Sequence, residues 1–330
     1  MKIVLLRRPG GPDALEVCEA PVPEPRANDV LIKAEAFGVG QPDALIRKGV
    51  YHWMPPLPAN PGNDLTGGIA GMGASVNGLT LGQKVLLTAR DLPQRGGCYA
   101  ELVAVPADAV HVLPENVDFE QAAALANYQV AYALLHETAG PRVPGSVLVV
   151  GAAGGIGSAL VQLAKLAGMT VIGTVSSAEK AAFARAQGAD QVINYKERSV
   201  PETTKELTGG RGVDLILDHV GGSSFTDHLS ALATWGTLVS YNAFTPLPEK
   251  NLLSEMRAHV DKNPAVRCFS FHSYDHDPQG RRRLMRTVIE LLAKGAIRPA
   301  IGARFSLSEV RQAHALLDTG AVLGKIVMHP

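Results

Sequence analysis

A glycine-rich hexapeptide, AAGGIG at residues 152–157, is the stretch of this sequence whose residue types and spacing could do chemistry. It matches the G-x-G-x-x-G spacing with alanine in the first position. Glycine there lets the backbone turn tightly and approach a pyrophosphate, and a following helix directs free N–H groups and its positive dipole end at the phosphates. The pattern therefore predicts a dinucleotide site. The residues assigned to it are Ala153, Gly154, Gly155 and Ile156.

A membrane span is the alternative interpretation of the same region, because residues 143–164 carry no charge. Pro144 and several glycines interrupt that run, however, and no aromatic residue marks either end. The nucleotide interpretation explains each feature: residues 147–150 form a short strand that is apolar on both faces, and an amphipathic helix follows the glycines and stops at Gly168. In that helix Ser158 is expected on the face away from the core. We therefore predict a strand, a glycine turn and a helix.

The end of the next expected strand, residues 170–175, indicates which dinucleotide binds. An NAD-selecting domain ends this strand with Asp or Glu, which binds the ribose 2′-hydroxyl. Here Ser176 and Ser177 follow the strand, and the first acid, Glu179, already lies in the next helix. Because no carboxylate would repel a 2′-phosphate, we predict that the cofactor is NADP(H).

Four residues near this strand are assigned to the adenine side of the cofactor. Ser176 can donate a hydrogen bond to the 2′-phosphate, and Lys180 can supply a positive charge. Tyr195, at the end of the third expected strand, can close the adenine pocket. The alternatives are a surface lysine and a partly buried tyrosine. Gly173, within the strand, completes the set.

The elements that must position these residues indicate an α/β chain of two domains. The chain has 330 residues, of which 46% are hydrophobic and 19% charged, as in globular proteins. Residues 1–120 are rich in proline, glycine and short β-type runs. Strands, glycines and helices alternate through residues 121–269, which is typical of a doubly wound parallel sheet. Residues 270–330 end in a helix and a strand, and we expect that strand to complete the first domain.

Charge and cysteine content restrict the partners and the compartment. The 31 basic residues balance 31 acidic ones, so no overall field recruits nucleic acid or a membrane surface. A local cluster is interpreted as a solvated helix face: Arg281, Arg282, Arg283 and Arg286. The three cysteines are far apart and predict no disulfide framework, and the N-terminus is too short in apolar residues for a secretory signal. We therefore expect a cytoplasmic protein.

Several segments resemble the medium-chain dehydrogenase/reductase superfamily and, within it, the zinc-independent quinone oxidoreductase (zeta-crystallin-like) branch. The similarity covers nearly the whole chain. Its markers are FGVGQPDALIRKGVY (37–51), PGNDLTGGIAGMGASVNGLTLGQKV (61–85), AAGGIGSALVQLAKLAG, KAAFARAQGADQVINYKE (180–197) and AHALLDTGAVLGKIVMHP (313–330). The resemblance implies a GroES-like domain followed by a Rossmann domain, and a homodimer that pairs through the region 236–270.

The zinc ligands of related enzymes are replaced in this sequence. Relatives that bind zinc carry a cysteine where this chain has Gly40, and a histidine and glutamate where it has Asn63 and Asp64. The third ligand position falls at about Ala126. Zinc needs three or four N, S or O ligands, so we expect no metal. Without a Lewis acid, alcohol oxidation is difficult, whereas NADPH can reduce an electrophilic small molecule such as a quinone or an α,β-unsaturated carbonyl.

The resemblance also implies a substrate pocket. Tyr51 matches a family tyrosine that faces the nicotinamide and either donates a proton or only covers the pocket floor. The asparagine of the branch falls at Gly40, where Gln41 could substitute from the next position, and a family threonine appears as Val130. The pocket is therefore assigned to Gly40, Gln41, Tyr51, Asn63 and Val130.

Further residues are assigned to the nicotinamide side of the cofactor. Ligands lie at the carboxyl ends of parallel strands, which places Tyr241, Asn242 and Phe271 there. Lys325 resembles a C-terminal family lysine near the cofactor, with a surface residue as the alternative. His219 and His272 have no visible partner in the sequence and are given no role.

Three functions compete at this point. The first is NADPH-dependent reduction of a quinone or a small enone. The second is reduction of enoyl thioesters, which Tyr51 would suit. The third is a cofactor-binding protein with a structural or RNA-binding role, as zeta-crystallin-like relatives can have. The neutral charge balance argues against RNA as the main partner.

Overall fold

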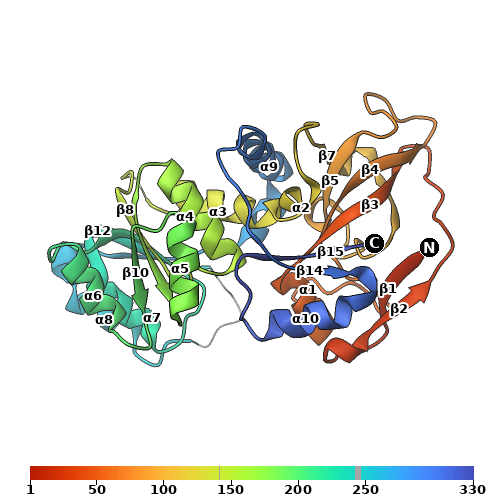
Figure 1. Ribbon diagram of the computed structural model, residues 1–330. Helices are drawn as coiled ribbons and strands as arrows, with labels where there is room; N and C mark the ends of the chain where they lie inside the picture. The colour runs from red at the N-terminus through yellow and green to blue at the C-terminus, as the bar shows by residue number, and fades with distance from the viewer. Residues whose placement is uncertain (141, 242–246) are drawn as a thin grey trace. The chain divides into compact units, whose positions relative to one another are not determined.

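The computed structural model describes residues 1–140, 142–241 and 247–330 of the chain. These residues form two compact units (Figure 1). One unit comprises Met1–Ala126 and Pro278–Pro330, and the other comprises Asn127–Asp277. The first unit is therefore built from both ends of the chain, and the second is inserted between them.

The Asn127–Asp277 unit contains a six-stranded, fully parallel sheet of order β10-β9-β8-β11-β12-β13. Its strands are β8 (Ser146–Val149), β9 (Thr170–Val175), β10 (Gln191–Asn194), β11 (Val213–Asp218), β12 (Leu232–Ser240) and β13 (Ala265–Cys268). The chain order reverses between β8 and β11, so a crevice at the carboxyl ends of these two strands is the expected ligand position. The predicted doubly wound sheet is confirmed.

Helices cover the faces of this sheet, which explains its apolar strands. They are α3 (Leu125–Glu137), α4 (Gly155–Leu166), α5 (Ala178–Ala186), α6 (Val200–Leu207), α7 (Ser224–Asp227) and α8 (Leu252–Ala258), with single 3-10 turns at His228–Ala231, Val260–Lys262 and Phe271–His276. All four residues of β8 are buried. Helices α4 and α5 lie on the same side of the sheet (Figure 1). A strand covered on both faces is buried on both faces, so its side chains are apolar rather than charged.

The uncharged run at residues 143–164 folds as predicted into β8, a glycine turn and α4. Helix α4 is followed by Gly168 at φ +77°, a left-handed conformation that glycine adopts without strain. The prediction for Ser158 was wrong, because this residue is buried and donates a hydrogen bond to the carbonyl of Gly155 at 3.2 Å. Among the described residues, no helix is both long enough and apolar enough to cross a bilayer.

The other unit is built on a seven-stranded sheet of order β14-β15-β3-β4-β5-β7, with β6 paired to β3. The strands are β3 (Asp29–Val39), β4 (Asp64–Met72), β5 (Lys84–Thr88), β6 (Leu102–Pro106), β7 (Val110–Val112), β14 (Ile301–Ser306) and β15 (Lys325–His329), and β1 (Lys2–Leu6) pairs separately with β2 (Leu15–Glu19). Strand β15 pairs antiparallel with β3, where Ile326 lies opposite Val39. The last strand thus returns to the first sheet, as predicted.

The helices of this unit are α1 (Gln41–Lys48), α2 (Phe119–Ala122), α9 (Pro278–Ala293) and α10 (Val310–Asp318), with 3-10 turns at Pro12–Ala14, Ala89–Asp91, Ala107–Ala109 and Leu307–Glu309. Residues from both ends of the chain form one core, in which Phe37 and Leu65 pack in the same cluster as Val310 and Met328.

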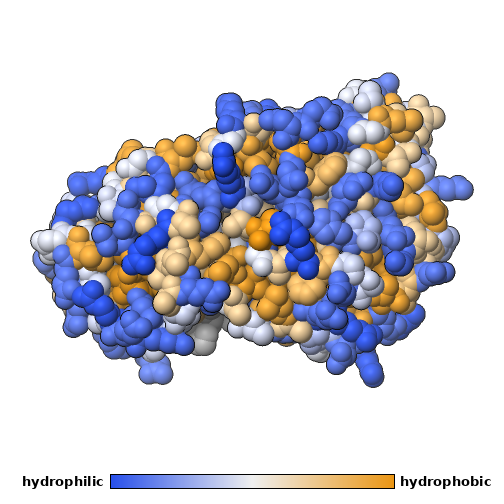
Figure 2. All heavy atoms as spheres, viewed as in Figure 1, coloured by the Kyte–Doolittle hydropathy of each residue, from blue (hydrophilic) through white to orange (hydrophobic). Residues whose placement is uncertain are grey.

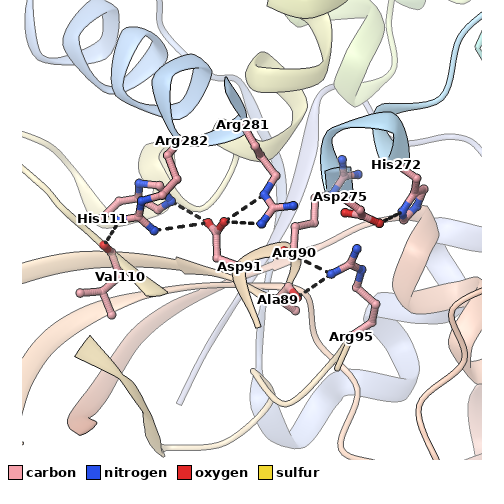
Figure 3. A network of polar contacts seen from close by, with 10 residues as sticks. All are labelled: Ala89, Arg90, Asp91, Arg95, Val110, His111, His272, Asp275, Arg281 and Arg282. Atoms are coloured by element: carbon pink, nitrogen blue, oxygen red, sulfur yellow. Dashed lines mark hydrogen bonds and ion pairs between the residues drawn. The ribbon is translucent and has the colours of Figure 1, made fainter. Parts of the chain in front are cut away.

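A buried ion-pair network fastens α9 to this sheet (Figure 3). Asp91 accepts hydrogen bonds from Arg281 at 2.9 Å and pairs with His111 at 2.8 Å. Arg282 donates to the carbonyl of Val110 at 2.8 Å. The side chains of Asp91, His111 and Arg281 are each at least nine-tenths buried. The prediction of a solvated face was therefore wrong for Arg281, although Arg283 and Arg286 are exposed.

The surface shows no gathering of hydrophilic residues in the view of Figure 2, where hydrophilic and hydrophobic residues are interspersed over the whole face. This agrees with the equal numbers of basic and acidic residues in the sequence, 31 of each.

Candidate active site

The glycine turn lies at the carboxyl end of β8, at the point where the strand order reverses. Gly151 has φ +75°, and a side chain there would also overlap the ring of His219. A Cβ on Gly157 would overlap the carbonyl oxygen of Gly151. Both positions therefore require glycine for the fold itself. The motif had been placed from residue 152 onward, so the glycine in the left-handed conformation is one residue earlier than expected.

Strand β9 holds the turn in place through a residue that the sequence did not indicate. The Gly151 amide donates to the Thr174 hydroxyl at 3.1 Å, and the Ala152 amide donates to the Thr174 carbonyl at 3.0 Å. A Cβ on Gly173 would lie 2.7 Å from the Cβ of Ala152. Gly173 thus serves the turn by allowing close packing beneath it.

Gly154 differs from these glycines, because the chain leaves space around it. A Cβ added there would have one neighbour within 4 Å, the Gly151 carbonyl oxygen at 3.7 Å. Gly154 is the N-cap of α4 in an extended conformation, φ −78°. The first amides of a helix have no intrahelical acceptor and attract anions. A phosphate that approaches these amides explains a glycine that packing does not require.

The residues assigned to the adenine side lie at the ends of β9 and β10. Ser176 directly follows β9, and Ser177 caps α5 by accepting a hydrogen bond from the Lys180 amide at 3.3 Å. The Tyr195 amide donates to the Val175 carbonyl at 3.1 Å, which sets Tyr195 beside the end of β9. Its side chain is 53% exposed. The partly buried packing position is therefore excluded for this tyrosine, and its contact with the adenine side of the cofactor stays a prediction.

A histidine and a tyrosine meet on the other side of the glycine turn. His219 Nδ1 lies 3.1 Å from the Val150 carbonyl oxygen and 3.3 Å from the Tyr241 hydroxyl. Burial lowers the pKa of His219 despite the neighbouring Asp218, and burial raises the pKa of Tyr241. Both rings are therefore neutral at pH 7. The carbonyl can only accept, so Nδ1 of His219 carries the proton.

The remaining predicted residues of this unit are placed less directly. Asn242 lies outside the described residues. Phe271 is buried at the start of a 3-10 turn, with its ring centroid 4.9 Å from that of Tyr274. Val130 is buried in α3. His272 pairs with Asp275 at 3.2 Å, so it has a partner within its own turn.

In the unit formed by the two chain ends, four polar residues form a buried cluster. Asp43 accepts a hydrogen bond from the Asn63 side-chain amide at 2.6 Å and another from the Gly40 backbone amide at 2.8 Å. Lys325 Nζ lies 3.5 Å from Asp64 Oδ2. Each of the four side chains is more than nine-tenths buried. The structure thus brings Lys325 together with Asn63 and Gly40, which were assigned to the substrate pocket.

Burial dominates the electrostatics of this cluster. It raises the pKa of Asp43 to about 6, and the negative charge of Asp64 acts in the same direction. The positive charge of Lys325 and the hydrogen bonds from Gly40 and Asn63 oppose the shift. Two carboxyls face one ammonium, so Asp43 takes up a proton at a higher pH than an ordinary aspartate does.

Tyr51 lies in the same unit, close to two arginines. Burial raises the pKa of its phenol, while the charges of Arg90 and Arg95 and a hydrogen bond from Arg95 lower it in part. Arg95 is held by hydrogen bonds to the carbonyls of Ala89 and Arg90, each 3.2 Å (Figure 3). The phenol is neutral at pH 7 and stands beside cations that would stabilise its anion. Gln41, by contrast, is exposed at the start of α1.

Comparison with known proteins agrees with this architecture. The model of the alcohol dehydrogenase GroES-like domain matches residues 26–115, and that of the zinc-binding dehydrogenase matches residues 155–306. Quinone oxidoreductases of Salmonella typhimurium and Pseudomonas aeruginosa are each 33% identical over 97% of this chain and 97% of the relative. The chain belongs to the quinone oxidoreductase family. The predicted resemblance to that branch of the medium-chain dehydrogenases/reductases is confirmed.

Solved structures similar to this chain extend the comparison. The Escherichia coli quinone oxidoreductase complexed with NADPH has a TM-score of 0.86 and 29% identity, with 100% of both chains covered. An NAD-dependent alcohol dehydrogenase has a TM-score of 0.89 at the same 29% identity and full coverage of both chains. The fold is therefore shared by enzymes with different cofactors and substrates, and the choice between them depends on the site.

A zinc ion, although named in one matching family model, does not fit the residues of this quinone oxidoreductase family member. Gly40 has no ligand atom, and the Asn63 amide nitrogen is bonded to Asp43. Within the described ranges, no group of three or more His, Cys, Asp or Glu side chains could hold a metal ion. Zinc sites need three or four such ligands, so we assign no metal role to these positions.

Several residues of the site were missed by sequence reasoning. Thr174 and His219 act on the glycine turn from other strands, and Arg95 acts on Tyr51 from a loop distant in sequence. Asp43 and Asp64 stood inside the motifs that were compared with zinc enzymes. Asp43, three residues after Gly40, and Asp64, at the glutamate position of the zinc-binding relatives, were the available signal, because buried carboxylates need a cation nearby.

Proposed function

We propose that this member of the quinone oxidoreductase family binds NADPH and transfers hydride to a quinone or a small α,β-unsaturated carbonyl without a metal. The acid-free end of β9 carries the cofactor choice, with Ser176, Lys180 and exposed Tyr195 around it. The space at Gly154 supports a bound pyrophosphate. The NADPH complex of the Escherichia coli relative supports the same cofactor.

In this reaction the cofactor and the side chains of the site would have different roles. NADPH, when bound, supplies the hydride, that is, a proton with two electrons. Neutral Tyr241 and neutral His219 would line the nicotinamide side without adding charge. Tyr51 would give a proton to the reduced acceptor, since Arg90 and Arg95 stabilise the phenolate left behind. Solvent would then return the proton to Tyr51.

The cofactor choice is tested by binding. Titration of the purified protein with NADPH and with NADH, followed by nicotinamide fluorescence, should give at least about tenfold tighter binding of NADPH, because a charge-assisted contact to the 2′-phosphate is worth roughly 1.5–3 kcal/mol. Tighter binding of NADH would contradict the proposal and favour the NAD-dependent relative as the better guide.

The acceptor is tested by stopped-flow oxidation of bound NADPH. A panel of benzoquinones, naphthoquinones, enals and crotonyl thioesters separates the leading hypothesis from enoyl-thioester reduction. Oxidation of simple alcohols with NAD⁺ tests the alcohol dehydrogenase alternative. Fast oxidation by quinones or enones supports the proposal. If no acceptor oxidises NADPH, both reductase hypotheses fail, and a cofactor-binding role without catalysis is left.

The same proposal includes a cytoplasmic location and a homodimer, with a small electrophile rather than nucleic acid or membrane as partner. Cys18, Cys98 and Cys268 are free thiols, as a reducing compartment allows. Strand β13 pairs only with β12 in the described sheet, so its other edge can accept a strand. Sedimentation velocity at micromolar concentration should show a dimer, and a monomer would refute this part.

A further inference from the structure

The side chain of Lys325 reaches the buried cluster along a path cleared by two glycines. Lys325 begins β15, and the register of β15 on β3 sets it beside Gly40. A Cβ on Gly38 would lie 2.9 Å from Lys325 Cε, and a Cβ on Gly40 would lie 3.3 Å from Lys325 Nζ. The G-V-G sequence at 38–40 therefore makes room first for the aliphatic stem and then for the ammonium.

The ammonium lies at the distance from residue 40 at which a metal ion would stand in zinc-binding relatives. In zinc-binding relatives residue 40 is a cysteine. With a zinc–sulfur distance of about 2.3 Å, the metal would lie about 3.3 Å from the Cβ of such a residue. Lys325 Nζ lies 3.3 Å from the Cβ position of Gly40. The ammonium thus occupies the shell at which a thiolate-bound metal would stand.

The neighbours of the ammonium hold it without using its hydrogen-bonding capacity. Among the described residues its side chain forms an ion pair with Asp64 at 3.5 Å, which is longer than an N–H···O hydrogen bond. Lysine has three N–H donors. Lys325 is buried, whereas Gly40 is partly exposed and has no side chain between its backbone and the ammonium 3.3 Å from its Cβ position.

We propose that Lys325 is a catalytic residue that binds the oxygen of the acceptor and stabilises the negative charge formed there during hydride transfer. The proposal rests on the proposed reductase function and names the residue that takes over the metal's role as electrophile. In this proposal Lys325 contacts the acceptor, whereas the sequence predicted that it contacts the cofactor.

The step balances without a further reactant. For an enone, the hydride forms a C–H bond at the β-carbon, the electron pair of the C=C bond shifts, and the carbonyl oxygen becomes an enolate oxyanion. The nicotinamide is oxidised by two electrons and the enone is reduced by two. Lys325 donates hydrogen bonds to the oxyanion and keeps its proton. Tyr51 or solvent supplies the proton that completes the product.

Three variants separate charge from packing. Lys325→Met removes the ammonium and keeps the stem, Lys325→Arg keeps the charge, and Gly40→Asn places a side chain against the ammonium while keeping both Lys325 and Asp64. Gly40 has extended backbone, φ −146°, so asparagine is tolerated there. We expect kcat/KM for enones to fall about 100-fold in Lys325→Met, less than tenfold in Lys325→Arg, and about tenfold in Gly40→Asn, with the Kd for NADPH unchanged.

A series of ring-substituted enones provides a readout that lost packing does not move. Lys325→Met should make kcat/KM depend more steeply on electron withdrawal by the substituent, because weak acceptors need the ammonium most. Equal slowing of all acceptors, with an unchanged slope, would overturn the proposal. If Lys325→Met does not fold, Gly40→Asn decides: wild-type kcat/KM with a wild-type slope in that variant also overturns it.

Binding of p-nitrophenolate, an oxyanion that needs no turnover, distinguishes this inference from the proposed function. With NADP⁺ present, the wild type should bind it at least tenfold more tightly than Gly40→Asn or Lys325→Met, as followed by its visible absorbance. If the wild type reduces no acceptor, the proposed function fails while this assay still tests Lys325. Equal affinity in all variants would overturn the role of Lys325.

Discussion

His314 should make the unit that contains it sensitive to acid. It lies on α10 with no exposed surface, and neither ring nitrogen has a hydrogen-bond partner among the described residues. Burial, assisted by the positive charge of Arg47, lowers its pKa from 6.5 to about 3. The folded chain therefore keeps the ring neutral at pH values where the unfolded chain protonates it.

The size of the effect follows from that shift. As the pH falls below 6.5, His314 becomes protonated in the unfolded state but stays neutral in the folded state. The free energy of unfolding therefore decreases with falling pH until the folded-state pKa of about 3 is reached. Between pH 7.5 and pH 5 the loss amounts to roughly 2 kcal/mol. His314→Leu removes this loss, and it also removes two buried polar atoms without partners, which by itself is neutral or stabilising.

The assay needs a signal from one unit, because two units can unfold separately. The chain has two tryptophans, and Trp53 belongs to the same unit as His314. In a Trp235→Phe background, Trp53 fluorescence during urea unfolding reports that unit. His276→Leu, at an exposed histidine of the other unit, is a control that should leave the Trp53 curves unchanged. The stability difference between His314→Leu and its parent should grow by roughly 2 kcal/mol from pH 7.5 to pH 5. Parallel curves for the two proteins would refute a buried neutral histidine.

Three further predictions test the site and its support. Gly154→Ala should weaken NADPH binding at least about tenfold, with a stability loss of at most about 1 kcal/mol from the poorer N-cap. Gly157→Ala should lower stability more, by about 1–3 kcal/mol, and equal effects of both on stability would contradict the assignment of open space at Gly154. Asp91→Asn should cost about 3–5 kcal/mol in urea unfolding, because it leaves Arg281 buried without its charge partner; a change below about 1 kcal/mol would show that the network is replaceable. Tyr51→Phe should lower kcat about 100-fold if the phenol is the proton donor, and an unchanged kcat would leave it as a wall of the pocket.

The order of strands and helices around the glycine turn was predictable because its signals are local. An apolar strand, a glycine group and an amphipathic helix follow one another within residues 146–168, and each reports its own conformation. The clamp by Thr174 was not predictable in the same way. Its side chain contacts Gly151 across a strand pair, and nothing in its own neighbourhood distinguishes it from any other strand threonine.

Periodicity also shows which helix residues share a face, but not what covers that face. The arginines of α9 were interpreted as solvated because charges at helical spacing usually are. Asp91 is 190 positions earlier in the chain and lies against Arg281, which changes the environment of that arginine completely. Two residues at that separation come together because the fold places the Ala89–Asp91 turn against α9. A single sequence does not show that contact.

The cluster around Gly40 needs a positive charge although the ligand positions of the zinc-binding relatives are replaced. Asp43 and Asp64 stay buried, and two buried carboxylates are unstable unless a cation or a proton neutralises them. Lys325 supplies the cation from the last strand, and the raised pKa of Asp43, about 6, lets a proton neutralise the rest. An ammonium placed for this structural reason is also a fixed hydrogen-bond donor in a water-poor site, which is the property that a developing oxyanion needs. The ion pair that neutralises the buried Asp64 thus also fixes the ammonium that would stabilise the oxyanion.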